Sequence, residues 1–324
     1  MPKAPSFWYQ KHPGLWCYNL WPLTWVYRFF ARLRRWVRRP QKAPFPVISV
    51  GNLVMGGAGK TPVVKALSEM LKNIGYHPVV ISKGYGAKQR KPLWVDASLH
   101  TYKDVGDEAL LLSHYVPTLV CRRRKKTLGV VPFQRNVVLV LDDGHQQRDI
   151  KTDINVLVYD HKQGVGNGYV FPQGPLRETV KQGLSRTHAV VHVGGKRSAH
   201  GVVPVFYADF LPSHPLPAKT KVWGVCGLGY PQKFLHTLKK MEVNVVGFSA
   251  FPDHHPYTFS DLHSIAQQAA QKDATLVTTE KDWLRWPENA TLPSVIHIDV
   301  HWHHEAKVRT FLKERLQKVL STLH

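Results

Sequence analysis

Residues 46–62 of the chain read PVISVGNLVMGGAGKTP, and this stretch decides the fold. Residues 46–50 suit a short buried strand, and apolar residues recur at helical spacing from Val63 to Leu71. A glycine-rich turn that leads from a buried strand into a helix is the local structure of a phosphate-binding loop. The stretch therefore predicts an α/β fold, with a P-loop NTPase-like parallel sheet that carries the loop at its carboxyl edge.

The residue types of this loop suit a nucleotide that carries phosphates. Glycines let backbone N–H groups approach phosphate oxygens, and the helix that follows directs its positive end at them. Lys60 would reach the β- and γ-phosphates of ATP, and the hydroxyl of Thr61 would hold Mg²⁺. The usual spacing places another glycine at position 54, where this chain has Val54. The predicted nucleotide-binding residues are Gly56, Gly57, Ala58, Gly59, Lys60, Thr61 and Pro62.

A second apolar strand, expected near 137–142, ends in two acids, Asp142 and Asp143. A carboxylate at this end of a strand beside a phosphate loop typically meets Mg²⁺ or its water. An Asp-Asp-Gly sequence also occurs as a simple turn, which is the structural alternative. With Thr61 and Glu108, the two acids make up the predicted metal site.

Two further segments suggest how a hydroxyl is activated. Asp107 stands at the start of a predicted helix, where it stabilises the helix or acts as a catalytic base. His254 lies in a loop, Phe251-Pro252-Asp253-His254-His255-Pro256-Tyr257, between a predicted strand and helix. A single histidine that orients a carboxylate is a better use of this loop than metal binding, although a solvated histidine is the alternative.

Arg177 follows a Gly/Pro-rich connection, 166–175, expected to cross between the two halves of the protein, and it can meet phosphate.

The charge of the chain points to an anionic partner. The formal net charge is +22, and Glu69 is the only acidic residue among the first 95. On a helix over 26–39, apolar side chains fall within an arc of about 120°, opposite six arginines. That pattern predicts a helix in the headgroup region of an anionic membrane, and a helix packed on the domain core is the alternative. The apolar side chains are Val26, Phe29, Phe30, Leu33, Trp36 and Val37.

The chain is long enough for two domains. We expect a P-loop domain over 1–155, which includes the membrane-associating helix at about 14–39, and a smaller α/β domain over 160–297. The smaller domain would carry strands near 189–193, 222–226, 243–248 and 275–278. The helix within 298–324 would pack back on the first domain. Three scattered cysteines predict neither a disulfide framework nor a zinc site.

The motifs, taken in this order, resemble the tetraacyldisaccharide 4'-kinase family of lipid A synthesis. The matching stretches run from about residue 14 to 285 and include 49–62, 82–86, Gly106-Asp107-Glu108, Asp142-Asp143-Gly144, Gly166 to Glu178, 226–234, Phe251 to His254 and Thr278 to Asp282. The resemblance implies that ATP and Mg²⁺ are used, that a tetraacylated glucosamine disaccharide 1-phosphate is the acceptor, and that a cleft lies between two halves. It assigns catalysis to Asp107, His254 and Lys60. It places substrate contacts at Asn52, Tyr85, Arg124, Gln146 and Arg177.

The same reading places the protein at the cytoplasmic face of the inner membrane, as a peripheral or monotopic monomer that meets an anionic surface. Two alternatives stay open from the residues alone. A soluble P-loop NTPase or small-molecule kinase would carry the basic helix as a structural element. A nucleic-acid-binding protein would suit the charge, but the sequence contains no recognisable nucleic-acid motif.

Overall fold

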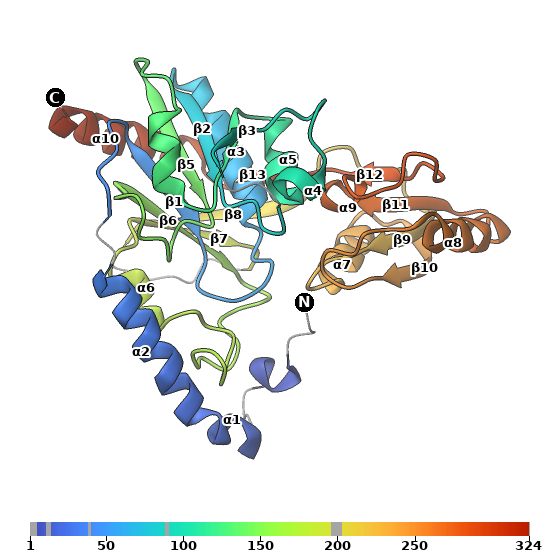
Figure 1. Cartoon of the computed structure of the whole chain (residues 1–324). Helices are drawn as coiled ribbons and strands as arrows, with labels where there is room; N and C mark the ends of the chain where they lie inside the picture. The colour runs from blue at the N-terminus through green and yellow to red at the C-terminus, as the bar shows by residue number, and fades with distance from the viewer. Residues whose placement is uncertain (1–4, 11–13, 38–39, 88–90, 196–202, 324) are drawn as a thin grey trace.

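The computed structural model describes residues 5–10, 14–37, 40–87, 91–195 and 203–323. Within these residues the chain forms two β-sheets, each covered by helices, as Figure 1 shows. We call the nine-stranded sheet with its helices the larger unit, and the four-stranded sheet with its helices the smaller unit. The α/β class that the sequence predicts is confirmed.

The larger sheet has the strand order β13-β8-β7-β6-β1-β5-β2-β4-β3. Neighbouring strands are parallel, except that β3 and β13 pair antiparallel with β4 and β8. In the register of β1 with β5, Val50 lies beside Asp142, so the phosphate loop and the two acids emerge at the same edge. The bounds are β1 Val47–Gly51, β2 His77–Ser82, β3 Leu93–Trp94, β4 Thr118–Val120, β5 Val137–Asp142, β6 Ile154–Asp160, β7 Ala189–Val193, β8 Val205–Pro212 and β13 Ile298–Trp302.

The smaller sheet is wholly parallel and has the order β10-β9-β11-β12. Its bounds are β9 Lys221–Cys226, β10 Asn244–Ala250, β11 Thr275–Thr279 and β12 Ser294–Ile296. The sequence places strand 189–193 in the smaller domain, whereas β7 pairs with β6 and belongs to the larger sheet. The larger sheet also takes in β8 and, from far along the chain, β13. The smaller unit therefore begins near 221 rather than at 160.

Helices cover the sheets or extend from them. Those of the larger unit are α3 Lys60–Asn73, α4 Tyr102–Val105, α5 Asp107–Ser113, the 3-10 helix η2 Arg124–Gly129, α6 Val180–Leu184 and α10 Glu305–Leu323. Those of the smaller unit are α7 Gln232–Lys240, α8 Phe259–Gln271 and α9 Glu280–Trp283. The N-terminal segment contains the 3-10 helix η1 Ser6–Tyr9, α1 Leu15–Asn19 and α2 Trp21–Val37.

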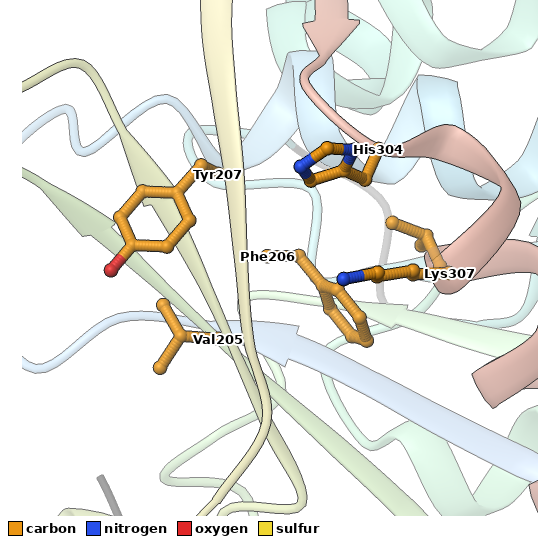
Figure 2. A pocket seen from close by; sticks show the side chains of 6 residues that line it. Val205, Phe206, Tyr207, His304 and Lys307 are labelled. Atoms are coloured by element: carbon orange, nitrogen blue, oxygen red, sulfur yellow. The ribbon is translucent and has the colours of Figure 1, made fainter. Parts of the chain in front are cut away.

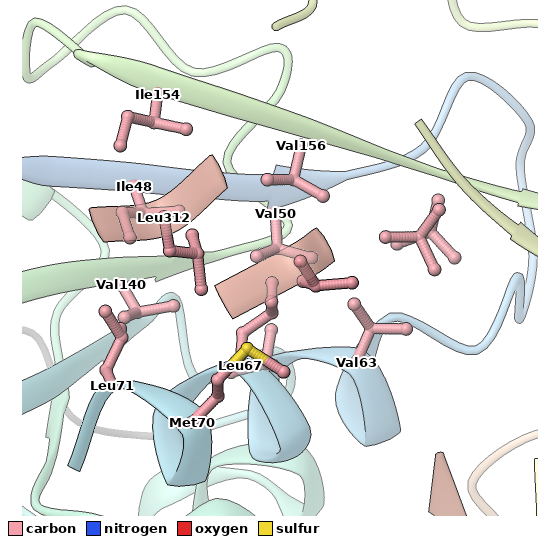
Figure 3. Close-up of a cluster of buried hydrophobic side chains, with 14 of the residues drawn as sticks. Ile48, Val50, Val63, Leu67, Met70, Leu71, Val140, Ile154, Val156 and Leu312 are labelled. Atoms are coloured by element: carbon pink, nitrogen blue, oxygen red, sulfur yellow. The ribbon is translucent and has the colours of Figure 1, made fainter. Parts of the chain in front are cut away.

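The main core lies between the larger sheet and the helices α3 and α10, as Figure 3 shows. Val63 and Leu67 of α3 pack against Ile48 and Val50 of β1, and Leu312 of α10 reaches the same cluster. Both faces of β1 are buried along its whole length. A central strand held this firmly gives the loop that follows it a fixed starting point.

The N-terminal segment is docked on residues 167–177 of the larger unit. The indole of Trp8 donates to the carbonyl of Pro172 at 3.0 Å, and the hydroxyl of Tyr27 donates to that of Arg177 at 3.3 Å. Buried Cys17 exchanges hydrogen bonds with Gln173. The Gly/Pro-rich connection, expected to cross between the two halves, therefore serves as the docking site of the N-terminal segment.

The helix expected at about 14–39 is divided into α1 and α2, and its last residues, Arg38 and Arg39, lie outside the described residues. Pro22 lies in the first turn of α2, where its missing N–H breaks no intrahelical hydrogen bond. Among the described residues no helix combines the length and the apolarity that crossing a bilayer requires.

Candidate active site

The phosphate loop runs from the end of β1 to the start of α3. Lys60 is the first residue of α3, and its ammonium lies 3.5 Å from Oδ1 of both Asn52 and Asp143. Asn52 is fully buried, and its amide donates to the carbonyl of Val54 at 2.9 Å. The structure thus brings predicted residues Asn52, Lys60 and Asp143 together. Thr61 and Pro62 stand beside them in the first turn of α3, partly exposed.

The two unusual positions of the loop have packing reasons. Gly59 has φ +78°, and a Cβ there would lie 2.2 Å from the ring of Phe210, so glycine is required. Val54, which stands where the common motif has glycine, is buried in a cluster with Leu53, Leu157 and Leu176. Val54 therefore fixes the start of this loop by apolar packing, where the common motif has a flexible glycine.

Asp142 ends β5 as a deeply buried carboxylate. The Ser82 hydroxyl donates to its Oδ2 at 3.2 Å, while its Oδ1 has no hydrogen-bond partner among the described residues. Burial, followed by the charges of Glu108 and Asp143, raises the pKa of Asp142 to about 7. A buried carboxylate oxygen without a partner, close to a second acid, suits a cation.

Asp143 differs from its neighbour because two cations face it. Burial alone would raise its pKa, but Lys60 and Arg177 hold the pKa well below its usual range. Arg177 donates to both carboxylate oxygens, at 3.0 and 2.9 Å, and to Oε1 of Gln146 at 3.1 Å. Gln146 in turn donates to the carbonyl of Asn52 at 2.8 Å. The predicted residues Asn52, Gln146 and Arg177 therefore form one network around Asp143.

Arg124 is not placed as a substrate contact. Its side chain is fully buried, and its guanidinium donates to the backbone carbonyls of Asp142 and Asp143. Burial lowers its pKa, an effect that the charges of Asp143 and Asp142 oppose. Because its side chain is buried and bonded to these carbonyls, Arg124 supports the turn that carries the two acids.

Between the two units, Asp107 meets His254. Oδ2 of Asp107, on α5 of the larger unit, lies 2.8 Å from Nδ1 of His254, in the loop after β10 of the smaller unit. Asp107 is 4% exposed, and its Oδ1 accepts the backbone N–H of Glu108. Tyr85, 63% exposed, has its ring centroid 5.9 Å from that of His254. The structure thus brings Asp107, His254 and Tyr85 together.

Two cations that the sequence did not predict as site residues lie beside Asp107. Nζ of Lys281 lies 3.7 Å from Asp107 and 3.2 Å from Glu108, and Nε of Arg285 lies 3.8 Å from Asp107. Burial tends to raise the pKa of Asp107, but the hydrogen bond from His254 and the charge of Lys281 lower it on balance. Lys281 belongs to the stretch Thr278 to Asp282 that carries the family resemblance, and this was the available signal. Asp107 is therefore held ionised, as a proton acceptor requires.

A separate pocket of about 170 Å³ lies between β8 and α10 (Figure 2). Its volume is below the roughly 300 Å³ at which ligand pockets begin. None of its lining residues is one of those assigned above, so it plays no part in this site. They are Val205, Phe206, Tyr207, His304, Lys307 and Val308.

The outer face of α2 is apolar and open to solvent. Eight large side chains, each at least 42% exposed, lie within about 160° of the helix circumference, and we call them the apolar stripe. Soluble proteins rarely expose so continuous an apolar face. Thr24 and Tyr27, on the other side, fix the helix to the larger unit. The stripe consists of Leu23, Trp25, Val26, Phe29, Phe30, Leu33, Trp36 and Val37.

Comparisons with known proteins agree with this geometry. Residues 16–317 match the model of the family described as tetraacyldisaccharide-1-P 4'-kinase. A tetraacyldisaccharide 4'-kinase of Rhodospirillum centenum is 41% identical over 297 residues, covering 88% of each chain. That of Rhodopseudomonas palustris strain BisB5 is 37% identical over 331 residues, covering 98% of this chain and 97% of the relative.

A solved structure shares the fold. The LpxK of Aquifex aeolicus, determined in complex with ATP, superposes with a TM-score of 0.75 at 24% sequence identity, covering 93% of this chain and 100% of that one. The family match and the two relatives extend over nearly the whole chain. The chain therefore belongs to the tetraacyldisaccharide-1-P 4'-kinase family.

Proposed function

We propose that this protein transfers the γ-phosphate of ATP to the 4'-hydroxyl of a tetraacylated glucosamine disaccharide 1-phosphate. The observation that carries the proposal is the contact between the two units that Asp107, on the same unit as the phosphate loop, makes with His254. A phosphate loop with Lys60 stands on the larger unit, and an ionised carboxylate, Asp107, is completed by His254 of the smaller unit. An enzyme that only hydrolyses ATP does not need a base such as Asp107 that is completed by a residue of the other unit.

The phosphate loop and its cations bind and orient the nucleotide. The amides of 56–61 and the ammonium of Lys60 would hold the β- and γ-phosphates, and the positive end of α3 adds to this field. In the structure Lys60 and Arg177 both pair with Asp143, so two cations are already gathered beside the loop. Their charge stabilises the negative oxygens of the transferring group.

The acids beside the loop fit a magnesium ion. Oδ1 of Asp142, which has no hydrogen-bond partner in the described part of the chain, would be a buried oxygen ligand. Glu108 would contribute a second carboxylate nearby, and Thr61 a hydroxyl. When bound, Mg²⁺ would neutralise charge on the phosphate oxygens. Asp143 is already paired with two cations, Lys60 and Arg177, whereas Glu108 is paired with one, Lys281, so Asp143 is the less suitable ligand.

Asp107 takes the proton of the 4'-hydroxyl as that oxygen attacks the γ-phosphorus. The carboxylate accepts it at Oδ2, and His254, which contacts the same atom through Nδ1, keeps the carboxylate oriented and disperses the charge. Arg285 and Lys281 stabilise the ionised form before the reaction. The exposed ring of Tyr85 lies beside His254, where a sugar ring can pack.

The apolar stripe is consistent with an acceptor that never leaves a membrane. An exposed aromatic and aliphatic face beside Arg28 and Arg32 suits insertion among lipid headgroups, with the arginines on lipid phosphates. We place the protein on an anionic membrane surface and, because the helix is basic, on the cytoplasmic face. The mode of attachment is monotopic, through α2.

One assay tests the activity directly. Purified protein is incubated with radiolabelled ATP, Mg²⁺ and the disaccharide 1-phosphate in detergent, and the lipid is examined for a new phosphomonoester. We expect label in the lipid, and its loss in Lys60→Met. ATP turnover at an unchanged rate with and without the lipid, with no labelled product, would refute the assignment in favour of a soluble NTPase.

A further inference from the structure

Lys233 crosses from the smaller unit to the phosphate loop. It is the second residue of α7, and its ammonium donates to the carbonyl of Gly57 at 2.5 Å while it pairs with Oδ2 of Asp160. Gly57 belongs to the loop that precedes Lys60, and Asp160 ends β6, the strand beside β1. A cation of the smaller unit therefore rests on the loop that is predicted to hold the terminal phosphates.

The anion that receives Lys233 is fixed in place. Asp160 is 7% exposed, and its Oδ1 accepts the backbone N–H groups of Lys162 and Gln163 at 2.9 and 3.2 Å. The amide of Gln163 donates to the carbonyl of Met55 at 3.3 Å, which ties this turn to the phosphate loop. Lys233 is therefore held near the loop by a preformed partner and is not a loosely placed surface lysine.

The loop has open space beside the contact. A Cβ built at Gly57 would meet no atom within 4 Å, and Gly57 is exposed. The amide groups of this turn are those that surround a phosphate in such loops. An ammonium has three donors, and the contacts with Asp160 and with the Gly57 carbonyl use two of them, so a charged phosphate oxygen can be added as a further strong partner.

We propose, on the basis of the proposed kinase function, that Lys233 contacts the terminal phosphate of bound ATP. The nucleotide would then be held by Lys60 from the larger unit and by Lys233 from the smaller one. ADP, which lacks the terminal phosphate, would lose the second contact. The side chain would thereby bind the smaller unit to ATP more strongly than to ADP.

Substitution of Lys233 tests this assignment through the difference between ATP and ADP. We expect Lys233→Met to weaken binding of a non-hydrolysable ATP analogue with Mg²⁺ by about tenfold to a hundredfold, the usual effect of losing a charged hydrogen bond. Binding of ADP should change by less than about twofold. Lys233→Arg should retain most of the analogue's affinity. Lys239→Met, which removes an exposed lysine of the same helix, is the matched control.

The variant Asp160→Asn distinguishes two roles of Lys233, a contact with the phosphate of ATP and a structural link between the two units. This variant keeps the ammonium but removes its anionic partner, so the preference for the ATP analogue over ADP should persist. Equal losses for ATP analogue and ADP in both variants would overturn the proposal, as would unchanged affinities in a folded Lys233→Met. Failure of the proposed function is a different result, because the wild-type protein would then show no phosphate transfer to lipid. Thermal melting of each variant verifies folding.

Discussion

Nδ1 of His254 lies 2.8 Å from Oδ2 of Asp107, although 147 positions of sequence separate them and they belong to different units. This contact exists only while the two units touch. Chemistry that depends on it is therefore tied to the relative position of the units, as in enzymes whose sites are completed by closure.

Removal of either member of this pair should reduce turnover strongly. We expect Asp107→Asn to lower kcat by about 100-fold, the usual contribution of a positioned base. His254→Asn should cost somewhat less, and the double variant should be no slower than Asp107→Asn, because the two act as one unit. Steady-state rates with saturating ATP and lipid measure this. His255→Asn is the control, since His255 pairs with Asp261 instead; additive losses would contradict the dyad.

Removal of Lys281 should move the acid limb of the pH profile. Its charge is one of the causes that keep the pKa of Asp107 low, so Lys281→Met raises that pKa. A base with a higher pKa is protonated earlier as pH falls, and kcat/KM should begin to decline at a higher pH than in the wild type. Profiles from about pH 3 to 7, a range that includes the usual aspartate pKa of about 3.9, test this, with Lys239→Met as control. Coincident acid limbs would exclude Lys281 from this role.

Placing the glycine of the common motif at position 54 should lower the free energy of unfolding. Val54 is 5% exposed within an apolar cluster. Val54→Gly loses this burial and adds backbone freedom, so the free energy of unfolding should fall by about 2–3 kcal/mol. Chemical denaturation measures the loss. Ala58→Gly, at a second position of the loop, offers a smaller-volume comparison, and a Val54→Gly protein as stable as wild type would refute the packing role.

Much of the larger unit could be predicted because its signals are local. Strands β1 and β5 are short apolar runs that end in glycines or acids, so both their existence and their shared edge follow from the sequence. The pairing of β8 with β13 could not be predicted in this way. Those strands are only partly buried and are contributed by segments about 90 residues apart, so no local pattern links them.

In the candidate site, too, some residues could be predicted from local sequence patterns and others could not. Lys60, Asp142 and Asp143 follow from motif chemistry, because loop and strand ends meet at one sheet edge. The burial of Arg124 could not be read from a run of three arginines, since only the packing behind β5 distinguishes it from its neighbours. Lys281 and Lys233 were missed because each contacts the larger unit from the smaller one, and spacing along the chain does not reveal such contacts.

His145 should make stability depend on pH. Burial, together with the charge of Arg186, lowers its pKa to about 4, whereas an unfolded histidine titrates near 6.5. As pH falls, the unfolded state takes up a proton before the folded state does. The free energy of unfolding is therefore highest above about pH 6.5 and decreases as pH falls toward 4. Between pH 7 and 5 this amounts to about 2 kcal/mol. Urea unfolding of wild type and His145→Asn measures it; parallel pH dependences would contradict the expectation.

The apolar stripe should control attachment to lipid. Replacing Phe29 and Leu33 by serine removes two of its side chains, and binding to anionic vesicles should weaken by about 10- to 100-fold, from partial loss of roughly 2 kcal/mol each. Leu292→Ser is the control, because Leu292 is also an exposed apolar side chain but lies in the smaller unit. Vesicle co-sedimentation gives the affinity. Unaltered sedimentation of the double variant would argue for a purely structural helix.

The docking of α2 against residues 170–177 has a kinetic consequence. Since α2 is packed on the body of the enzyme and not joined by a tether, the proposed attachment to a membrane would keep the active site at a set height above the bilayer. Encounters with an acceptor that carries four acyl chains then take place by lateral diffusion in two dimensions. Turnover would follow the mole fraction of acceptor in the membrane, so diluting it with inert lipid would slow the reaction even at constant bulk concentration.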